Sequence, residues 1–218
     1  MAVPFQNRSE AGRVLAGKLT GYRNREDVLV LALPRGGVPV GFEIAHALSA
    51  DLDIFLVRKL GLPGQEELAV GAIASGGVRV LNHGLLETLH LSPAVLESVA
   101  TRELRELERR ESLYREGRPA TPVRDRTIIL VDDGLATGAS MLAAVRALRP
   151  QGPRRIVVAV PVAAEAACDD FLREVDEVVC AATPEPFRAV GIWYEDFSQT
   201  TDEEVQELLE RAARERVS

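Results

Sequence analysis

The chain of 218 residues is long enough for one well-buried core, and its hydrophobic content of 46% is ordinary for a globular protein. Its net charge of -7, from 33 acidic and 26 basic residues, disfavours nucleic acid or an anionic membrane surface as a partner. The longest apolar run, residues 156–164, is far shorter than the roughly 20 residues that a membrane helix needs. The first ten residues lack the basic and apolar regions of a signal peptide, so we expect a cytoplasmic protein with no membrane partner.

The cysteines and histidines give little support to a disulfide framework or a zinc site. Cys168 and Cys180 form no CxxC pair, and we expect them to be two buried reduced thiols. His46, His83 and His90 have no partners at metal-ligand spacing, and structural roles are expected for all three.

Capping and turn residues divide the start of the chain into a helix and a strand-helix-strand unit. Ser9 caps the first helix, and Gly21 ends it. Short apolar runs at residues 28–33 and 54–57 are typical of parallel strands that are covered on both faces. A helix at about 40–48 joins them, so the sequence predicts a βαβ unit.

The next part of the chain predicts a mobile loop, a hairpin and a long helix. Residues 61–67 are polar and flanked by glycine, as mobile loops often are. A Gly-Gly pair joins a strand at 69–74 to a strand at 78–81, which predicts a hairpin. A Ser-Pro pair then opens a helix at about 93–114 with leucines at helical spacing and a charged opposite face.

In the second half of the chain, buried strands alternate with helices. The expected strands are 127–131, 156–160 and 178–181, and the expected helices are 139–148 and 163–175. Strands that alternate with helices predict a parallel sheet with right-handed crossovers. A capping box that begins at Thr201 opens a last amphipathic helix.

The clearest chemical signal lies in residues 128–140, where an apolar strand ends in Asp132 and Asp133 and a loop of small residues follows. The loop's N–H groups, the hydroxyls of Thr137 and Ser140, and the positive end of the next helix suit a phosphate. Two carboxylates beside a phosphate would repel it unless they face hydroxyl groups or a divalent cation on the same ligand. A phosphorylated sugar satisfies both demands.

This segment resembles the motif by which type I phosphoribosyltransferases bind 5-phosphoribosyl 1-diphosphate (PRPP), and its wording is closest to the adenine-type members. The resemblance implies that Asp132 and Asp133 hold the ribose hydroxyls and reach a metal ion only indirectly, through PRPP. It implies a 5′-phosphate loop made of Gly134, Leu135, Ala136, Thr137, Gly138, Ala139 and Ser140.

Two further segments resemble the same family in order and position, so that the resemblance spans roughly residues 28–160. Arg35, Gly36 and Gly37 follow the first strand and resemble the family's pyrophosphate loop. Arg58 and Lys59 resemble its basic segment, which leads into a flexible loop. Taken alone, the first would be a plain turn and the second a solvated strand end. Because the two segments occur together, all five of these residues are expected to bind the pyrophosphate group.

For the fold, the resemblance implies a Rossmann-like parallel β-sheet flanked by helices, with a small hood and a helical insertion. We expect a single domain over residues 1–218, with a core at about 25–182. The insertion is expected at about 92–116 and the C-terminal hood and tail at about 183–218. Family resemblance also implies a homodimer.

For the activity, the resemblance implies an enzyme that transfers 5-phosphoribosyl from PRPP to a nitrogen acceptor, with a nucleobase as the favoured acceptor, and releases pyrophosphate. Purine salvage within nucleotide metabolism is the corresponding process. The expected catalytic residues are Asp132, Asp133, Arg35 and Lys59, with Mg²⁺ as the cofactor that helps to neutralise the departing diphosphate.

Of the parts of this expected reaction, the acceptor substrate is the one that the sequence specifies least. Hypoxanthine-type members carry an additional acid where this chain has Ala136, so hypoxanthine and guanine are disfavoured. Trp193 and Tyr194 are the candidate acceptor-binding residues because either ring could stack on a heterocycle, although both could simply pack the tail against the sheet. Glu66 and Glu67 could contact the acceptor or be solvated loop charges.

Two other functions stay open. A PRPP-sensing regulatory protein could keep the fold and the ligand site with little or no turnover, but the retention of Arg35, Arg58 and Lys59 favours the enzyme. A PRPP-forming or phosphate-hydrolysing enzyme is disfavoured because the chain has no recognisable ATP site.

Overall fold

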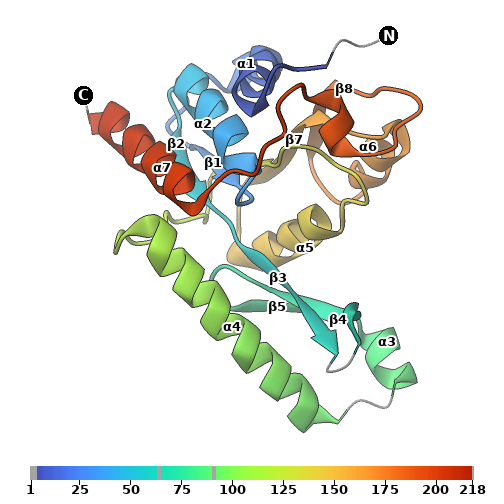
Figure 1. The fold of residues 1–218 in the computed structure, drawn as a ribbon. Coiled ribbons are helices and arrows are strands. Elements are labelled where there is room, and N and C mark those ends of the chain that lie inside the picture. The colour runs from blue at the N-terminus through green and yellow to red at the C-terminus, as the bar shows by residue number, and fades with distance from the viewer. Residues whose placement is uncertain (1–3, 63–64, 90–91, 218) are drawn as a thin grey trace.

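The computed structural model describes residues 4–62, 65–89 and 92–217, and its main body is a five-stranded parallel sheet (Figure 1). The strands run in the order β2-β1-β6-β7-β8, and each neighbouring pair is parallel. Their bounds are β1 (Val28–Ala32), β2 (Asp51–Ile54), β6 (Thr127–Val131), β7 (Arg155–Val162) and β8 (Glu177–Ala182). The predicted parallel α/β sheet is confirmed.

Helices cover both faces of this sheet. They are α1 (Arg8–Lys18) and α2 (Gly37–Leu48) on one face, and α5 (Ala139–Leu148) and α6 (Glu165–Phe171) on the other. Successive strand residues point to opposite faces, so Val30 and Ile129 pack with α1 and α2 while Leu31 and Leu130 pack with α5. Burial on both sides explains why these strands are continuous apolar runs.

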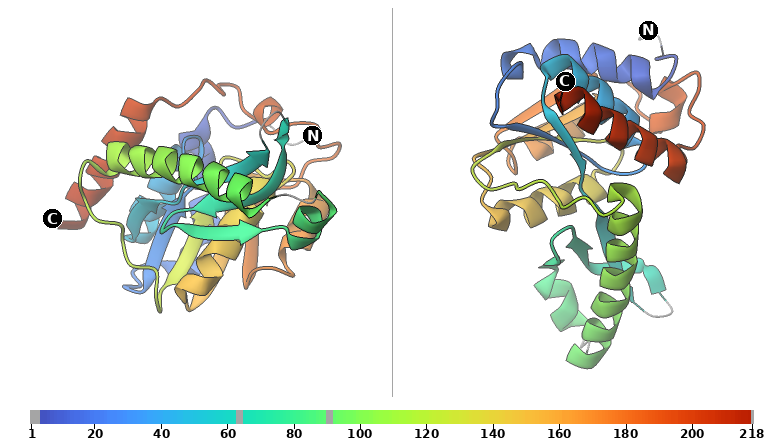
Figure 2. Two further views of the ribbon diagram at one scale, coloured as in Figure 1. Left: turned by 90° about the horizontal axis from the view of Figure 1, so that it is seen from below. Right: turned by 90° about the vertical axis from the view of Figure 1, so that its left-hand side faces the viewer.

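An antiparallel lobe, which we define as residues 57–115, projects from the body (Figures 1 and 2). Its elements are β3 (Val57–Leu62), β4 (Gln65–Ala74), β5 (Val78–Leu81), α3 (His83–Thr88) and α4 (Pro93–Arg115). The predicted hairpin is confirmed, since Gly76 and Gly77 have φ values of +82° and +73° that favour glycine. The lobe is larger than the helical insertion expected at 92–116, because the sheet β3-β4-β5 belongs to it.

The strand expected at 54–57 was placed wrongly: β2 runs from Asp51 to Ile54, and Phe55 and Leu56 lead out of the parallel sheet. Two aspartates made this strand look polar. Arg126 lies 2.7 Å from the Asp51 carboxylate, and Arg115 lies 2.9 Å from the Asp53 carboxylate. These partners come from distant parts of the chain, so the local pattern does not reveal them.

The loop expected at 61–67 is also corrected. Gly61 and Leu62 end β3, and Gln65 begins β4, so most of this segment is hairpin strand. Residues 63–64 and the side chains of Glu66 and Glu67 lie outside the described part of the structure. On both sides of residues 63–64, the strands therefore include positions that the glycines and polar residues had marked as a loop.

The C-terminal tail returns over the body and ends in α7 (Asp202–Val217), which packs against α2, β2 and α4. Thr201 accepts a hydrogen bond from the Glu204 N–H at 3.1 Å, as the capping box predicts. Short 3-10 turns are η1 (Thr20–Tyr22), η2 (Arg149–Gln151) and η3 (Val190–Trp193). Near η3, Tyr194 forms a β-bridge with Phe5, so the tail and the N-terminus meet on one side of the sheet.

The expectation of two reduced thiols is wrong, because Cys168 of α6 and Cys180 of β8 form a disulfide. Both residues are half-buried and pack against the core cluster that includes residues of α5. His46 makes a structural contact with Glu215 at 2.8 Å. Among the described residues, no helix has the length and hydropathy required to cross a membrane.

Candidate functional site

The candidate site lies at the carboxyl ends of β1 and β6, which are neighbours in the sheet with Ala32 opposite Val131. The two loops that follow these strands therefore touch. A Cβ added at Gly36 would overlap the Oδ2 atom of Asp133, and one at Gly37 would lie 2.8 Å from the Val131 carbonyl oxygen. Only glycine fits at either position, so the two motifs that the sequence separates by almost a hundred residues form one surface.

The first of these loops contains backbone donors without a partner among the described residues. The Gly37 N–H donates to the Leu33 carbonyl, whereas those of Arg35 and Gly36 have no acceptor among the described residues. The Arg35 side chain is one-third exposed, and its Nη1 atom lies 3.6 Å from Asp202 Oδ1. This turn thus offers these N–H groups beside Asp133 and a partly exposed guanidinium, which are groups that can bind a diphosphate.

The small-residue loop after β6 is held at both ends and open between them. The Leu135 N–H donates to the Val162 carbonyl at 2.8 Å, and Gly138 adopts φ +69° against the Phe171 ring. Between these anchors, Ala136 and Thr137 are exposed, and their N–H groups have no acceptor in the described chain. With the first turn of α5 immediately behind, the loop can bind an anion through backbone N–H groups and the helix dipole.

Asp133 is held by Arg8, a residue that no sequence pattern indicates. Arg8 Nε donates to Asp133 Oδ2 at 2.8 Å, and Arg8 Nη1 donates to the Ser198 carbonyl at 2.7 Å. The guanidinium carbon lies 4.0 Å from the centre of the Phe197 ring. Arg8 is only 12% exposed, so it is a built part of the site and no loose surface charge. Because 125 residues separate Arg8 from Asp133, no spacing pattern could have indicated this pair.

The two aspartates influence each other strongly. Burial, followed by the negative charge of Asp133, raises the pKa of Asp132. Burial also raises the pKa of Asp133, while the Arg8 hydrogen bond and charge oppose this rise. The Asp133 N–H donates to Asp132 Oδ1 at 2.8 Å, which fixes the orientation of that carboxyl group. Such a pair can accept hydrogen bonds from sugar hydroxyls that displace water from it.

The basic pair Arg58-Lys59 does not lie at the end of a parallel strand, as the sequence analysis expected, but inside β3 of the antiparallel lobe. Neighbouring strand residues face opposite ways. Arg58 faces α4, where its Nε atom donates to the buried carboxylate of Glu103 at 2.6 Å. Lys59 instead lines a cleft between the lobe sheet and α5, together with Ser140. Lys59 is therefore brought to the phosphate loop, and Arg58 is not.

The two aromatic residues named for the acceptor have different surroundings. The ring of Tyr194 is 6% exposed, and its hydroxyl donates to the Asp133 carbonyl at 2.5 Å. It packs between Phe5 and Phe197 and thereby supports the aspartate loop. Trp193 is half-buried in the same cluster. A stacking role for either ring stays a prediction, and Trp193 has the more accessible ring.

The metal-binding potential of the described residues is limited, since they contain no group of three or more His, Cys, Asp or Glu side chains that could hold an ion. Asp132 and Asp133 alone do not make a protein cage. Mg²⁺ usually keeps several waters and binds through one or two carboxylates plus substrate phosphates. The donor set therefore fits an ion delivered with a diphosphate ligand.

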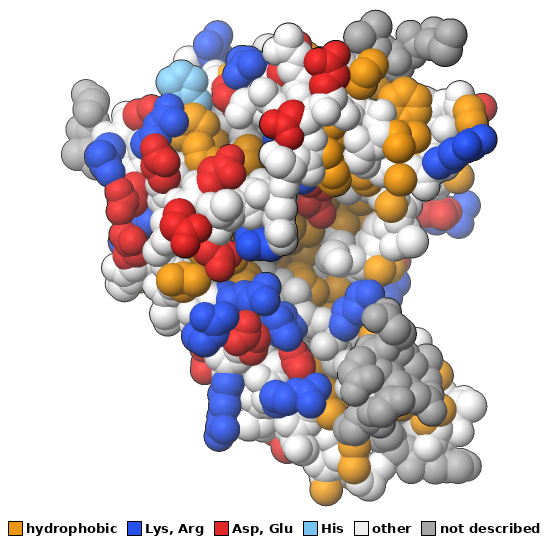
Figure 3. Space-filling view, in the orientation of Figure 1, with side chains coloured by type: hydrophobic (Ala, Val, Ile, Leu, Met, Phe, Trp, Pro, Cys, Tyr) orange, Lys and Arg blue, Asp and Glu red, His pale blue; other side chains and the backbone are white. Residues whose placement is uncertain are grey.

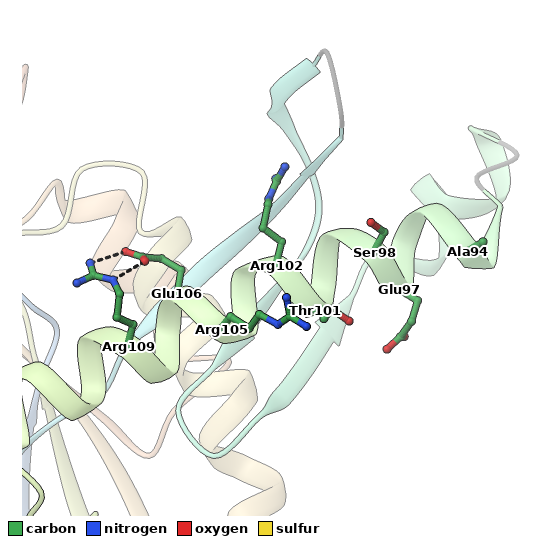
Figure 4. A pocket seen from close by; sticks show the side chains of 8 residues that line it. All are labelled: Ala94, Glu97, Ser98, Thr101, Arg102, Arg105, Glu106 and Arg109. Atoms are coloured by element: carbon green, nitrogen blue, oxygen red, sulfur yellow. Dashed lines mark hydrogen bonds and ion pairs between the residues drawn. The ribbon is translucent and has the colours of Figure 1, made fainter.

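A second hollow lies along α4. Basic side chains gather on this part of the lobe (Figure 3). Arg102, Arg105 and Arg109 line the hollow, and Arg109 is paired with Glu106 at 2.8 Å (Figure 4). None of the site residues expected from the sequence lines this hollow. The carboxyl edge of the parallel sheet remains the candidate site.

Comparison with known proteins identifies the family of this chain. A family model described as the phosphoribosyl transferase domain matches residues 5–182. Two Mycobacterium tuberculosis proteins, from strains CDC 1551 and H37Rv, carry the provisional name phosphoribosyl transferase and are each 47% identical over 210 residues. The match covers 96% of this chain and 47% of each relative, so the chain spans about half the length of these curated relatives.

Two solved structures have folds similar to that of this chain. The crystal structure of TT1426 from Thermus thermophilus is 43% identical, with a TM-score of 0.83 over 95% of this chain and 98% of that one. The structure of the AQ2163 protein from Aquifex aeolicus is 12% identical, with a TM-score of 0.51 over 93% of this chain and 84% of that one. The latter likeness concerns the fold alone.

Proposed function

Because the chain belongs to the phosphoribosyl transferase domain family, we propose that it transfers the 5-phosphoribosyl group of PRPP to a nitrogen of a heterocyclic acceptor. One observation carries this proposal: the aspartate pair and the open phosphate loop meet the glycine turn of residues 36–37 on one edge of the sheet. A ligand that spans all three needs two anionic ends and a hydroxylated centre. PRPP has this composition.

In the proposed complex, the loop from Gly134 to Ser140 binds the 5′-phosphate through N–H groups and hydroxyls. Asp132 and Asp133 accept hydrogen bonds from the ribose hydroxyls. Arg35 and the N–H group of Gly36 face the diphosphate, and the Lys59 side chain reaches it from the cleft that Lys59 lines with Ser140. Arg58 remains a candidate for the same group, although Glu103 holds it on the far side of β3.

The reaction then needs no protein nucleophile. The bond between the anomeric carbon and the diphosphate oxygen breaks, and its electron pair leaves with the diphosphate. The acceptor nitrogen forms the new bond and loses its proton to solvent. Positive charge that develops on the ribose ring is offset by the neighbouring aspartates, so the protein acts by positioning and electrostatics. Mg²⁺, when bound with PRPP, would neutralise charge on the departing diphosphate.

The acceptor and the organisation of the protein are part of the same proposal. We propose a nucleobase acceptor in a purine-salvage reaction, with Trp193 beside the heterocycle, and one domain over residues 1–218 whose hood includes the tail from 183 onward. The contact of Arg8 with Asp133 and Ser198 supports adding the N-terminus to that hood. The homodimer remains a prediction of family resemblance.

A screen of nucleobases for pyrophosphate release tests the proposed reaction. We expect release that depends on protein, PRPP and one heterocycle, and a product in which the heterocycle carries ribose 5-phosphate. An Asp133→Asn variant is the matched control, because the loss of a hydrogen bond to a charged group weakens PRPP binding by more than about tenfold. Unchanged PRPP affinity in this variant would contradict the role of Asp133.

A PRPP-sensing protein is the second candidate, and one observation favours it. Two of the cations expected at the diphosphate already have carboxylate partners, Glu103 for Arg58 and Asp202 for Arg35. A sensor need not stabilise a leaving group. Tight PRPP binding without pyrophosphate release from any acceptor in the screen would favour this function over the enzyme.

A further inference from the structure

Arg35 lies in the turn of residues 35–37 that follows β1. Its side chain belongs to a series of contacts that the proposed reaction does not use. Its Nη1 atom lies 3.6 Å from Asp202 Oδ1. The same oxygen accepts a hydrogen bond of 2.6 Å from the hydroxyl of Tyr114. Tyr114 lies near the end of α4 and Asp202 at the start of α7, so three elements far apart in the sequence meet behind this turn.

The Tyr114 hydroxyl and the Asp202 carboxylate form the middle of this series of contacts, and both are held in place. Tyr114 is 2% exposed and packs in the cluster that joins α4 to α7. Burial and the Asp202 carboxylate raise the pKa of Tyr114 to about 12, so its hydroxyl remains a donor at neutral pH. Asp202 is thus tied to the lobe helix on one side, and the capped first turn of α7 holds its backbone on the other.

The contact between Asp202 and Arg35 is of a different kind. At 3.6 Å it is an ion pair that is too long for a hydrogen bond. Among the described residues, the Arg35 guanidinium donates no hydrogen bond to another group. Asp202 therefore restrains the guanidinium by charge and leaves its N–H groups available for a ligand oxygen.

We infer that Asp202 and Tyr114 are positioning residues that hold Arg35 at the place where the diphosphate of PRPP binds. This inference rests on the proposed function and adds two residues that lie outside the loops of the site. It also gives the long helix α4 and the C-terminal helix α7 a part in ligand recognition. Restraint of Arg35 before binding lowers the entropy that is lost when it meets the diphosphate.

A similar trio elsewhere in the chain supplies a matched control. Tyr22 donates to Glu177 Oε2 at 2.5 Å, and Arg155 Nη2 lies 2.9 Å from the same oxygen. Arg155 and Glu177 begin β7 and β8, so this trio lies at the opposite edge of the parallel sheet. Tyr22→Phe and Glu177→Gln remove the same groups as Tyr114→Phe and Asp202→Asn, but far from the proposed site.

The test is a calorimetric titration of these four variants and the unaltered chain with PRPP, pyrophosphate and ribose 5-phosphate, all with Mg²⁺. We expect Tyr114→Phe and Asp202→Asn each to weaken PRPP and pyrophosphate binding by about threefold to tenfold. Ribose 5-phosphate has no diphosphate to meet Arg35, so its affinity should stay the same. The control variants should bind all three ligands as the unaltered chain does.

An Arg35→Met background sharpens the result. If Tyr114 acts through Arg35, adding Tyr114→Phe to this background should change PRPP affinity no further. Equal losses for PRPP and ribose 5-phosphate would mean a general structural role and would overturn the inference. So would an unchanged PRPP affinity, or a tighter one in Asp202→Asn, which would show that Asp202 competes with the ligand for Arg35. Failure of the unaltered chain to bind PRPP would instead refute the proposed function itself.

Discussion

Two regions of the molecule bring distant segments together in different ways. At the carboxyl edge of the parallel sheet, two loops pack closely because one of them has glycine at the contact. At the junction with the antiparallel lobe, the segments are joined by pairs of opposite charges. Gly36 lies directly against Asp133, where there is no room for another atom. At the junction, Arg115 of α4 reaches Asp53 of β2, with both side chains 9% exposed. The edge is therefore sensitive to an added methyl group, whereas the junction is sensitive to a lost charge.

Removing a charge at the junction is expected to have the largest effect. Arg115→Met leaves the Asp53 carboxylate buried without its cation, so we expect the free energy of unfolding to fall by about 3–5 kcal/mol. Arg154→Met is the control, because Arg154 is 62% exposed and its pair with Asp27 should contribute at most about 1 kcal/mol. Denaturant titration measures both. Equal effects would contradict the importance of the buried pair.

Arg8 tests a place where the carboxyl edge also depends on charge. Arg8→Met removes the charged hydrogen bond to Asp133, and we expect the free energy of unfolding to fall by about 1.5–3 kcal/mol. PRPP affinity should fall as well, because Asp133 loses the group that orients it. Full affinity in calorimetry would mean that Arg8 only stabilises the hood.

Adding a methyl group at the carboxyl edge should have a smaller effect on stability and a clear effect on binding. Gly36→Ala overlaps the Asp133 carboxylate, and we expect a loss of about 1–3 kcal/mol in unfolding free energy together with weakened PRPP binding. Gly17→Ala in α1 is the control, since the added Cβ meets nothing within 4 Å beyond its chain neighbours and the backbone of its own helix, and helix propensity favours alanine. If both variants bind PRPP normally, the close approach at Gly36 does not matter for the ligand.

The last prediction concerns pH. The pKa values of Asp132 and Asp133 are raised in the folded chain, so protons bind the folded state more tightly than the unfolded one. Stability from this pair is present below the ordinary aspartate pKa of about 4 and is lost as pH rises through the raised values. Between pH 5 and 8 the ligand-free chain should therefore lose more stability than Asp132→Asn does. An identical pH slope in the two proteins would contradict the raised pKa values.

The difference between the two regions also explains how much the sequence could predict. The strand, acid pair and loop of residues 128–140 are contiguous, so their local pattern correctly predicted a buried strand, a loop and a helix in succession at the sheet edge. The Gly-Gly hairpin was predictable for the same reason. Backbone conformation at such points depends on a few neighbouring residues.

Features that depend on distant partners could not be predicted. The polar strand β2 is stabilised by arginines from other segments, and its position was misjudged. Arg8 meets Asp133 only in the folded chain, and Arg58 turns toward Glu103 because α4 packs behind β3. The disulfide between Cys168 and Cys180 likewise depends on α6 packing beside β8. Local spacing contains no information about these pairings.

Calorimetric titration of PRPP into the unaltered chain with Mg²⁺, with ribose 5-phosphate as the control ligand, tests the central claim most directly. The arrangement of the aspartates, the phosphate loop and Arg35 predicts saturable binding at one site and a clear preference for PRPP. Absence of binding, or equal affinity for the two ligands, would contradict a site that recognises both the ribose phosphate and the diphosphate.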